Sequence, residues 1–71
     1  MNHRQRSLLV SALDRPETIF TFKTHMAVHG VVYQTARADL LGLHDLGLLD
    51  VHKSGRKFSF TAAPELEAKL T

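Results

Sequence analysis

The sequence lacks cysteine, and it also lacks any long apolar run. Without cysteine the chain forms neither a disulfide nor a zinc site with cysteine ligands, which suits a reducing cytoplasm. Its apolar runs are far shorter than the roughly 20 residues that a membrane span requires. The basic opening stretch MNHRQRSLLVSALDR is interrupted too soon for a signal peptide. We therefore expect a cytoplasmic protein with no membrane partner.

An excess of one charge is also missing, because nine Lys and Arg residues against seven Asp and Glu residues leave a formal net charge of +2. This balance permits nucleic-acid binding without strongly indicating it. The chain has 71 residues, of which 44% are hydrophobic, and this length predicts one domain over residues 1–71. Such a small core is marginally stable alone, so a larger parent protein or a second copy would stabilise it.

The first helix is predicted over NHRQRSLLVSALD, at residues 2–14. Asn2 can cap this helix and Gln5 can bond back to it, while the residue before Pro16 disfavours helical angles and ends the helix. The predicted apolar face consists of Leu8, Leu9, Ala12 and Leu13. The next stretch, TIFTF at residues 18–22, is rich in β-branched and aromatic residues and predicts a short strand.

A second helix is predicted over FKTHMAVH, at residues 22–29. Thr21 can end the strand and cap this helix. Phe22, Met26 and Val28 would face inward, and Gly30 would supply a left-handed turn residue after the helix.

The third helix is predicted from about Tyr33 to Leu46, with Leu40 buried on its apolar face and Gly47 as its stop. Period-two alternation on both sides of KSGR then predicts a β-hairpin over about residues 48–61, with Ser54-Gly55 as its tight turn. PELEAKL closes the chain as a short helix. The resulting fold is mainly α with a small β-hairpin, a winged helix-turn-helix with a three-helix core, a β-wing and a short C-terminal helix.

Three stretches, NHRQRSLLVSAL, HGVVYQTARADLLGLHDLGLLDVHKSGRKFSF and PELEAKL, resemble the C-terminal winged-helix segment of Fic-family proteins. Fic stands for filamentation induced by cAMP, and enzymes of this family commonly transfer AMP to protein hydroxyls, a reaction called AMPylation. YQTARADL with LGLLDVHKSGRKF is the most specific part, whereas the frame TAR.DL..L..LGLL occurs in many winged-helix transcription regulators. The resemblance implies a domain excised from the C-terminus of a longer, bacterial Fic-like protein.

Two departures from the family pattern matter. Val32 stands where the family usually carries a small hydroxyl residue, and a valine side chain cannot cap the third helix. The family's catalytic signature, a histidine followed by a glycine-rich anion loop with Asn and Arg, is missing. The four glycines are widely spaced and cannot form a phosphate cradle. We therefore expect no AMP transfer by this chain alone, and no cofactor.

The start of the third helix supplies the first set of candidate DNA-binding residues, because this part of a recognition helix meets base edges in the major groove. Gln can bond adenine and Arg can bond guanine in bidentate fashion. The candidates are Tyr33, Gln34, Thr35, Arg37 and Ala38. The alternative is a solvated helix start whose Arg37 pairs with Asp39 or Asp45, two carboxylates that also make the helix less basic than tight DNA binders usually are.

The hairpin tip supplies the second set of candidates, Lys53, Arg56 and Lys57, with His52 beside them. A basic wing would contact phosphate or the minor groove. The alternative is an exposed turn whose charges keep it soluble and protect an edge strand. His3, Arg4 and Arg6 add positive charge at the start of the first helix, where charge opposes the helix dipole, so contacts elsewhere could account for them.

Other residues favour structural roles. His25 and His29 have a spacing that can hold a metal, but no further ligand follows, so we expect surface or half-buried histidines and no metal site. The four phenylalanines should be core residues, whereas Leu41 and Leu48 should be partly exposed. No grouping of nucleophile, base and acid indicates catalysis.

The sequence thus leaves three functions open. The first is a winged-helix domain that binds double-stranded DNA. The second is an interaction module that packs on the Fic catalytic domain of the parent, or pairs with a second copy, and regulates AMP transfer. The third is a module that positions a protein substrate for the parent enzyme.

Overall fold

Capping side chains set the starts of the first two helices. The structure, a computed structural model, describes residues 1–70. At the start of α1 (His3–Asp14), the backbone amides of Asn2 and Gln5 each donate to the other residue's side-chain oxygen, both at 2.9 Å. Thr21 and Thr24 make the same reciprocal pair at the start of α2 (Phe22–His29). The predicted caps at Asn2 and Thr21 are confirmed.

The third helix, α3 (Tyr33–Asp45), begins without a side-chain cap, because Val32 occupies the N-cap position, as predicted. Leu46 is its C-cap, and Gly47 follows with a φ of +75°. Gly30 also has a positive φ, +62°, and its amide donates to the carbonyl of Met26 at 2.8 Å. A β-carbon is disfavoured in this left-handed region, so glycine is the residue that lets the chain turn sharply from α2 into α3.

The hairpin consists of β1 (Leu49–Ser54) and β2 (Lys57–Ala62), which pair antiparallel from Leu49 opposite Ala62 to Ser54 opposite Lys57. Its two-residue turn is therefore Gly55-Arg56, one residue later than the predicted Ser54-Gly55. The first residue of this turn has a φ of +61°, which Gly55 adopts at little cost and Ser54 would not. A short helix, α4 (Leu66–Leu70), follows the hairpin.

The predicted strand at residues 18–22 is wrong, because only Phe20 pairs with the hairpin. Its backbone amide and carbonyl exchange two bonds of 2.7 Å with Phe60 of β2, forming an isolated bridge. The amide of Thr18 bonds to the carbonyl of Arg15, and the amide of Thr21 is taken by the cap of α2. Backbone bonding on both sides of Phe20 thus stops the strand from growing.

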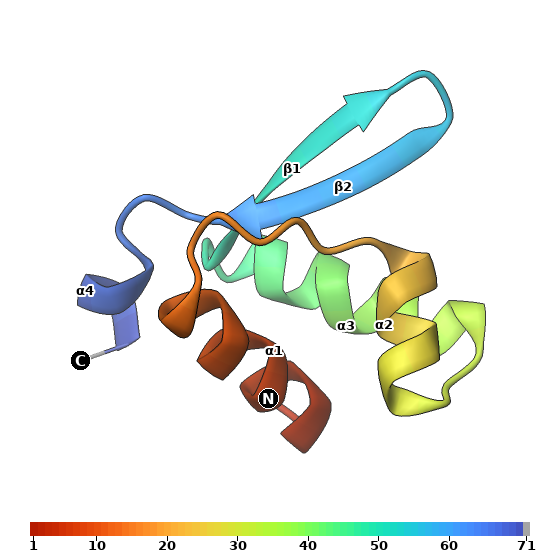
Figure 1. Cartoon of the computed structure of the whole chain (residues 1–71), viewed down its shortest axis with the longest axis horizontal. Coiled ribbons are helices and arrows are strands. Elements are labelled where there is room, and N and C mark those ends of the chain that lie inside the picture. Colours follow the sequence, from red (N-terminus) through yellow and green to blue (C-terminus); the bar gives the residue numbers. More distant parts are fainter. Residues whose placement is uncertain (71) are drawn as a thin grey trace.

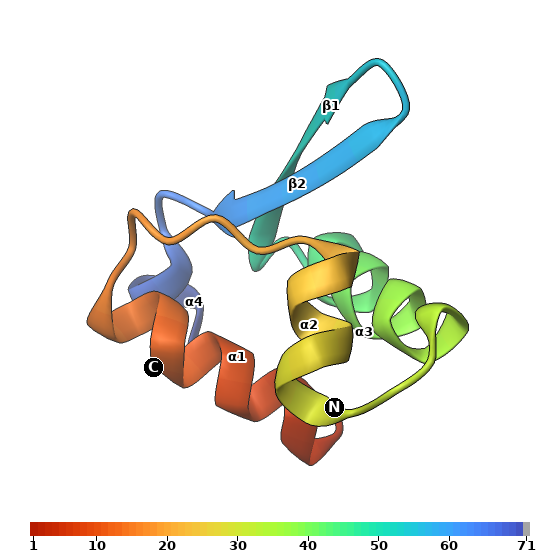
Figure 2. The same ribbon diagram turned by 45° about the vertical axis from the view of Figure 1, so that its right-hand side comes forward.

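The three longer helices pack together, and the hairpin projects from one side of them (Figure 1, Figure 2). α4 lies at the opposite end, near the end of α1. The described residues form a small α+β domain of four helices and one two-stranded antiparallel sheet, with extents of 30 × 27 × 20 Å. Its core contains Leu8, Leu9, Ala12, Phe22, Ala36, Leu40, Leu43, Leu48, Leu49, Phe60 and Leu66.

Burial of Leu40, which has 0% exposure, confirms the predicted rotation of α3. Two side chains predicted to face inward are instead exposed: Leu13 at 42% and Val28 at 75%. Leu13 lies about 100° around α1 from the buried Ala12, and on α2 the inward stripe contains His25 in place of Val28.

Three further predictions concern residues next to the core. Leu48 was expected to be partly exposed but is buried, because its amide and carbonyl tie it between Leu43 and Ala63. Leu41 is half-buried as expected. Phe20 and Phe58 pack against the core half-buried, whereas the other two phenylalanines lie within it.

Over residues 1–70, no helix is long and apolar enough to cross a membrane.

Candidate nucleic-acid interface

The predicted side chains at the start of α3 reach the surface. Tyr33 is 49% exposed, Gln34, Arg37 and Ala38 are exposed, and Thr35 is half-buried. They flank Ala36, which is fully buried and holds this turn of α3 against the core. The helix therefore presents polar groups outward from its first two turns while the same turns are anchored from behind.

Arg37 does not pair with Asp39 or Asp45, so the predicted ion pair of the alternative is wrong for the described residues, where the ion pairs involve other groups. Its guanidinium carbon instead lies 5.8 Å from the centre of the Phe22 ring, within the range of a cation–π contact. The aromatic ring contacts the guanidinium of Arg37 without neutralising its charge. The charge thus stays available to an anionic ligand.

Asp39 is buried, with 3% exposure, and its charge is used inside the protein. Its carboxylate accepts hydrogen bonds from Asn2 Nδ2 at 2.8 Å and from Arg4 Nε at 2.8 Å, both from the start of α1. His25 Nε2 of α2 lies 2.9 Å from Asp39 Oδ2. Arg4 is thereby explained as the partner of a buried carboxylate, although it stands where a positive charge opposes the helix dipole.

The pKa of the Asp39 carboxyl reflects these contacts. Burial raises this pKa, but the hydrogen bonds from Arg4, Asn2 and His25 outweigh burial and lower the pKa from 3.8 to about 2. Asp39 is therefore ionised and paired at neutral pH, and it adds no uncompensated negative charge to the exposed face of α3. Asp45, the other acidic residue of the helix, is exposed at the opposite end, roughly 16 Å along the axis from Gln34.

The hairpin tip is exposed along its whole length, from His52 to Lys57. The ammonium of Lys53 lies 5.4 Å from the centre of the Phe58 ring. His52 Nε2 lies 2.9 Å from Thr61 Oγ1, across the two strands. None of the tip's lysines and arginines is ion-paired within residues 1–70. Their charges are thus free to meet phosphates.

The two predicted sets of residues meet at a cavity of about 440 Å³. Tyr33 of α3 and both Arg56 and Lys57 of the hairpin line it. Lys23 of α2 joins them, and no sequence pattern selected this residue, because only packing places its helix beside the hairpin tip. The remaining candidates, Gln34, Thr35, Arg37, Ala38 and Lys53, lie on α3 and β1 outside the cavity lining.

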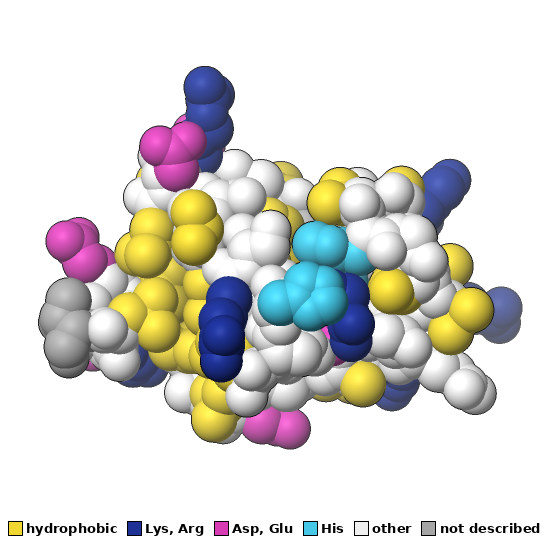
Figure 3. Space-filling model, turned by 90° about the horizontal axis from the view of Figure 1, so that it is seen from below, with side chains coloured by type: hydrophobic (Ala, Val, Ile, Leu, Met, Phe, Trp, Pro, Cys, Tyr) yellow, Lys and Arg dark blue, Asp and Glu magenta, His cyan; other side chains and the backbone are white. Residues whose placement is uncertain are grey.

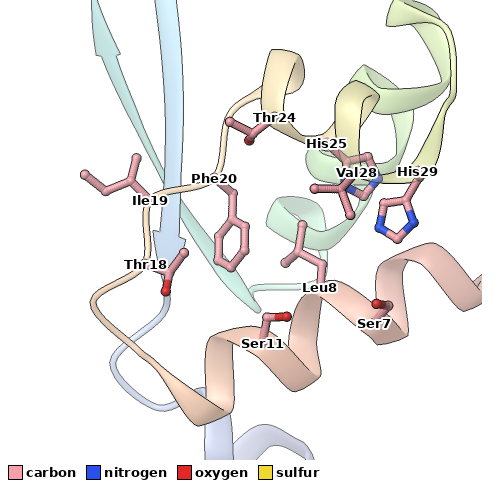
Figure 4. Close-up of a pocket in the computed structure, with 10 residues that line it drawn as sticks. All are labelled: Ser7, Leu8, Ser11, Thr18, Ile19, Phe20, Thr24, His25, Val28 and His29. Carbon is pink, nitrogen blue, oxygen red and sulfur yellow. The ribbon is translucent and has the colours of Figure 1, made fainter.

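A second cavity, of about 290 Å³, lies between α1, α2 and the segment that joins them (Figure 4). Its apolar lining residues are Leu8, Ile19, Phe20 and Val28, and the others are serine, threonine and histidine side chains. No lysine, arginine, aspartate or glutamate is among the lining residues that the structure places there. This cavity therefore offers no lysine or arginine to nucleic acid.

His25 and His29 stand side by side on α2, with ring centres 4.6 Å apart (Figure 4). Burial, and then the positive charge of His25, lower the pKa of His29. In the part of the chain that the structure describes, no group of three or more His, Cys, Asp or Glu residues is arranged to hold a metal ion. His29 is half-buried as expected, but His25 is buried, with 4% exposure, because Asp39 engages its ring and so joins α2 to α3.

Comparisons of this chain with protein-family models, curated proteins and solved structures find no match.

Proposed function

We propose that this domain binds double-stranded DNA as a winged helix-turn-helix, with α3 in the major groove and the hairpin as a wing on the adjacent backbone. One observation carries the proposal: the exposed polar start of α3 adjoins the same cavity as the hairpin-tip cations, which make no ion pair within residues 1–70. An α-helix with its side chains is about 10–12 Å wide, close to the roughly 12 Å width of the major groove.

The distribution of charge supports this proposal more than the net charge does. Asp39 is neutralised within the core and Asp45 lies at the far end of α3, so the first turns of the helix carry Arg37 without a neighbouring free carboxylate. Lys23, Arg56 and Lys57 extend the positive charge onto α2 and the hairpin. Phosphate contacts supply much of the affinity of DNA-binding proteins, and these side chains would supply them here.

In this proposal the domain belongs to a bacterial, cytoplasmic Fic-like protein. The domain itself performs no AMP transfer, and it brings the parent's transfer activity to DNA or places that activity under the control of DNA binding. The support is the resemblance of YQTARADL and LGLLDVHKSGRKF to the Fic C-terminal segment, together with the missing glycine-rich anion loop.

The test is fluorescence anisotropy of a labelled random duplex of about 20 base pairs, titrated at low and then at physiological salt. We expect non-specific binding with a Kd of about 10⁻⁴–10⁻⁶ M that weakens steeply as salt rises. Replacing Arg56→Glu together with Lys57→Glu should weaken binding to every sequence. It should also reduce the slope of log Kd against log salt by about 2, one for each lost phosphate contact.

The matched control is Arg6→Glu together with Arg15→Glu, which changes the net charge by the same amount at two exposed positions of the α1 region. This variant should bind DNA with nearly the same salt slope as the unsubstituted chain. An equal loss in both double variants would mean that only net charge matters, and the wing would have no assigned role. No binding of DNA by the unsubstituted chain at low salt would overturn the proposal.

An interaction module is the second candidate, and exposed apolar side chains away from the hairpin favour it. Leu13 of α1, Leu46 at the end of α3 and Leu70 of α4 are 42%, 60% and 40% exposed, respectively. Seen from below, hydrophobic side chains gather on the same side of the molecule as α4 (Figure 3). Sedimentation velocity over a range of concentrations tests pairing of two copies, and Leu46→Glu should abolish any dimer that uses this face.

A further inference from the structure

The cavity between α2, α3 and the hairpin combines aromatic rings with cations. The rings are Phe22, Tyr33 and Phe58, and the cations are Lys23, Arg56 and Lys57. Its volume, about 440 Å³, lies within the usual range for small-molecule sites, about 300–1,000 Å³. No Asp or Glu is among its lining residues in the described chain. The site therefore suits a ligand that has both a planar apolar part and a negative charge.

Phe22 forms the apolar floor of this cavity, because it is only 8% exposed and contacts the other two rings. Its ring centre lies 5.5 Å from that of Tyr33, with the rings nearly perpendicular at 80°. It lies 5.8 Å from that of Phe58, at an angle of 51°. Tyr33 itself is 49% exposed, so a large part of its surface is open to a ligand.

The cations come from elements on both sides of the rings. Lys23 belongs to α2, whereas Arg56 and Lys57 belong to the hairpin. All three side chains are exposed, and none takes part in an ion pair with residues 1–70. An anionic group placed among them would be approached from two elements at once, which favours a phosphate over an uncharged ligand.

Contact with an intact duplex does not use a cavity that combines aromatic rings with cations. In a base-paired duplex the faces of the bases are stacked, and proteins reach only their edges. Aromatic side chains bind bases that are unstacked, as in single strands and flipped nucleotides. Tyr33 and Phe58 thus offer a surface that duplex binding alone leaves without a ligand.

We propose that this cavity binds one nucleotide with an unstacked base, its base against Tyr33 and Phe58 and its phosphate among Lys23, Arg56 and Lys57. Two sources share this chemistry: a free nucleoside monophosphate, and an unpaired nucleotide in a DNA strand. The proposal uses the same surface as duplex binding but does not depend on it.

The first experiment titrates thymidine 5′-monophosphate, thymidine and inorganic phosphate into ¹⁵N-labelled full chain and follows the spectra by NMR. Tyr33 is the sole tyrosine and the chain has no tryptophan, so its ring resonances report on the cavity without overlap from another tyrosine. We expect the nucleotide to shift Tyr33 and the backbone amides of Lys23 and Phe58 in a saturable way. Thymidine should bind more weakly, and phosphate alone should leave the Tyr33 ring unmoved.

Matched variants distinguish the loss of the Tyr33 ring from a loss of the folded structure. Tyr33→Phe keeps the ring and should keep the affinity within about twofold, whereas Tyr33→Ala should weaken it about tenfold or more, the scale of one lost base–aromatic stack. Arg56→Gln with Lys57→Gln leaves the rings intact and should remove the preference for nucleotide over nucleoside. The dispersion of the amide spectrum shows for each variant that the chain is folded.

The second experiment compares a blunt duplex with the same duplex carrying a three-nucleotide thymidine overhang. We expect the overhang to tighten binding at least about fivefold in the parent and in Tyr33→Phe, but not in Tyr33→Ala. A preference for the overhang without binding of the free nucleotide identifies the strand as the source. Binding of the free nucleotide without that preference identifies the monophosphate.

The outcomes also separate this proposal from duplex binding. Equal binding of blunt and overhang DNA, with no response to the free nucleotide, would overturn the nucleotide site and leave duplex binding intact. Saturable nucleotide binding without any duplex binding would uphold the site and overturn the proposed function. Tyr33→Ala that binds the nucleotide as tightly as the parent would show that the ring has no part in the site.

Discussion

Asp39 is the residue at which the three longer helices meet. Its carboxylate takes hydrogen bonds from Asn2 and Arg4 of the α1 start and contacts His25 of α2, although Asp39 itself belongs to α3. Its side chain is 4% exposed, and that of Arg4 is 23% exposed. A buried carboxylate is stable only when its partners replace the lost water, and here these partners come from two other helices.

Acid should therefore weaken the fold through Asp39. Because the pKa of this carboxyl is about 2 in the folded chain against 3.8 ordinarily, the ionised form stabilises the fold above about pH 4. This stabilisation, about 2 kcal/mol from the size of the shift, is lost as the pH falls toward 2. Asp39→Asn should lower the free energy of unfolding near neutral pH by roughly 1.5–3 kcal/mol. It should also flatten the fall in stability between about pH 5 and pH 2.

Urea unfolding followed by circular dichroism measures both effects. Asp45→Asn is the control, because Asp45 is exposed on the same helix and makes no ion pair with the described residues. It should change the unfolding free energy by less than about 0.5 kcal/mol and keep the acid dependence of the parent. An equally steep acid dependence in Asp39→Asn would show that other carboxyls cause it.

At the scale of one element, α3 carries a glycine in its interior, which normally costs a helix about 1 kcal/mol relative to alanine. A β-carbon at Gly42 would lie 3.0 Å from Nε2 of Gln5, the amide that donates to the backbone carbonyl of Asp39 at 3.0 Å. The other end of the same amide accepts the backbone N–H of Asn2. Gln5 is held at both ends, so it cannot easily give way.

Gly42→Ala should thus destabilise the domain by about 1 kcal/mol, because disturbing a buried hydrogen bond outweighs the gain in helix propensity. In the background Gln5→Ala the obstacle is gone, and the same substitution should stabilise by up to about 1 kcal/mol. Urea unfolding of the four chains measures this double-mutant cycle. Stabilisation by Gly42→Ala in the parent chain would show that Gln5 moves freely and does not set the approach of α1 to α3.

At the scale of the whole molecule, the helices and the hairpin share one core with Leu40 inside it. Its side chain has 0% exposure and lies among buried residues of α1, α2, β1 and β2. Leu40→Ala should lower the free energy of unfolding by about 2–5 kcal/mol, the range for large-to-small core substitutions. This is a large part of the roughly 5–15 kcal/mol that holds most domains folded.

Thermal and urea unfolding measure this loss, with Leu46→Ala as the control. Leu46 is 60% exposed just after α3, so its truncation should cost less than about 0.5 kcal/mol. A similar loss in both variants would mean that burial does not distinguish the contribution of Leu40 from that of Leu46.

Local patterns in the sequence were sufficient for most of the secondary structure. The caps at Asn2 and Thr21, the turn at Gly30 and the end of α3 at Gly47 each depend on neighbouring residues alone, and all four predictions are confirmed. The prediction of a strand at residues 18–22 was wrong because a strand needs a partner strand along its length. Only Phe20 pairs with the hairpin, through its two backbone bonds to Phe60. The prediction that Val28 faces the core was wrong because the polar residue His25, and not Val28, lies on the buried side of α2.

The candidate site divides in the same way. Periodicity identified the exposed start of α3, and composition identified the basic hairpin tip, since both follow from residues close together in the chain. Whether DNA or a nucleotide binds there stays a prediction. Lys23 and the cavity that it shares with Tyr33 could not be foreseen, because they exist only where α2, α3 and the hairpin converge.

The sequence by itself determined where helices start and stop and which face of α3 is apolar, because capping, glycine turns and side-chain periodicity act within a few residues. Tertiary structure alone decided which charged side chains are buried and which form ion pairs. It buried Asp39 against Arg4, a residue 35 positions away, and left Arg37 and the hairpin cations without ion pairs among the 70 described residues. Electrostatic interactions depend on distance in space and on burial, and only packing sets both.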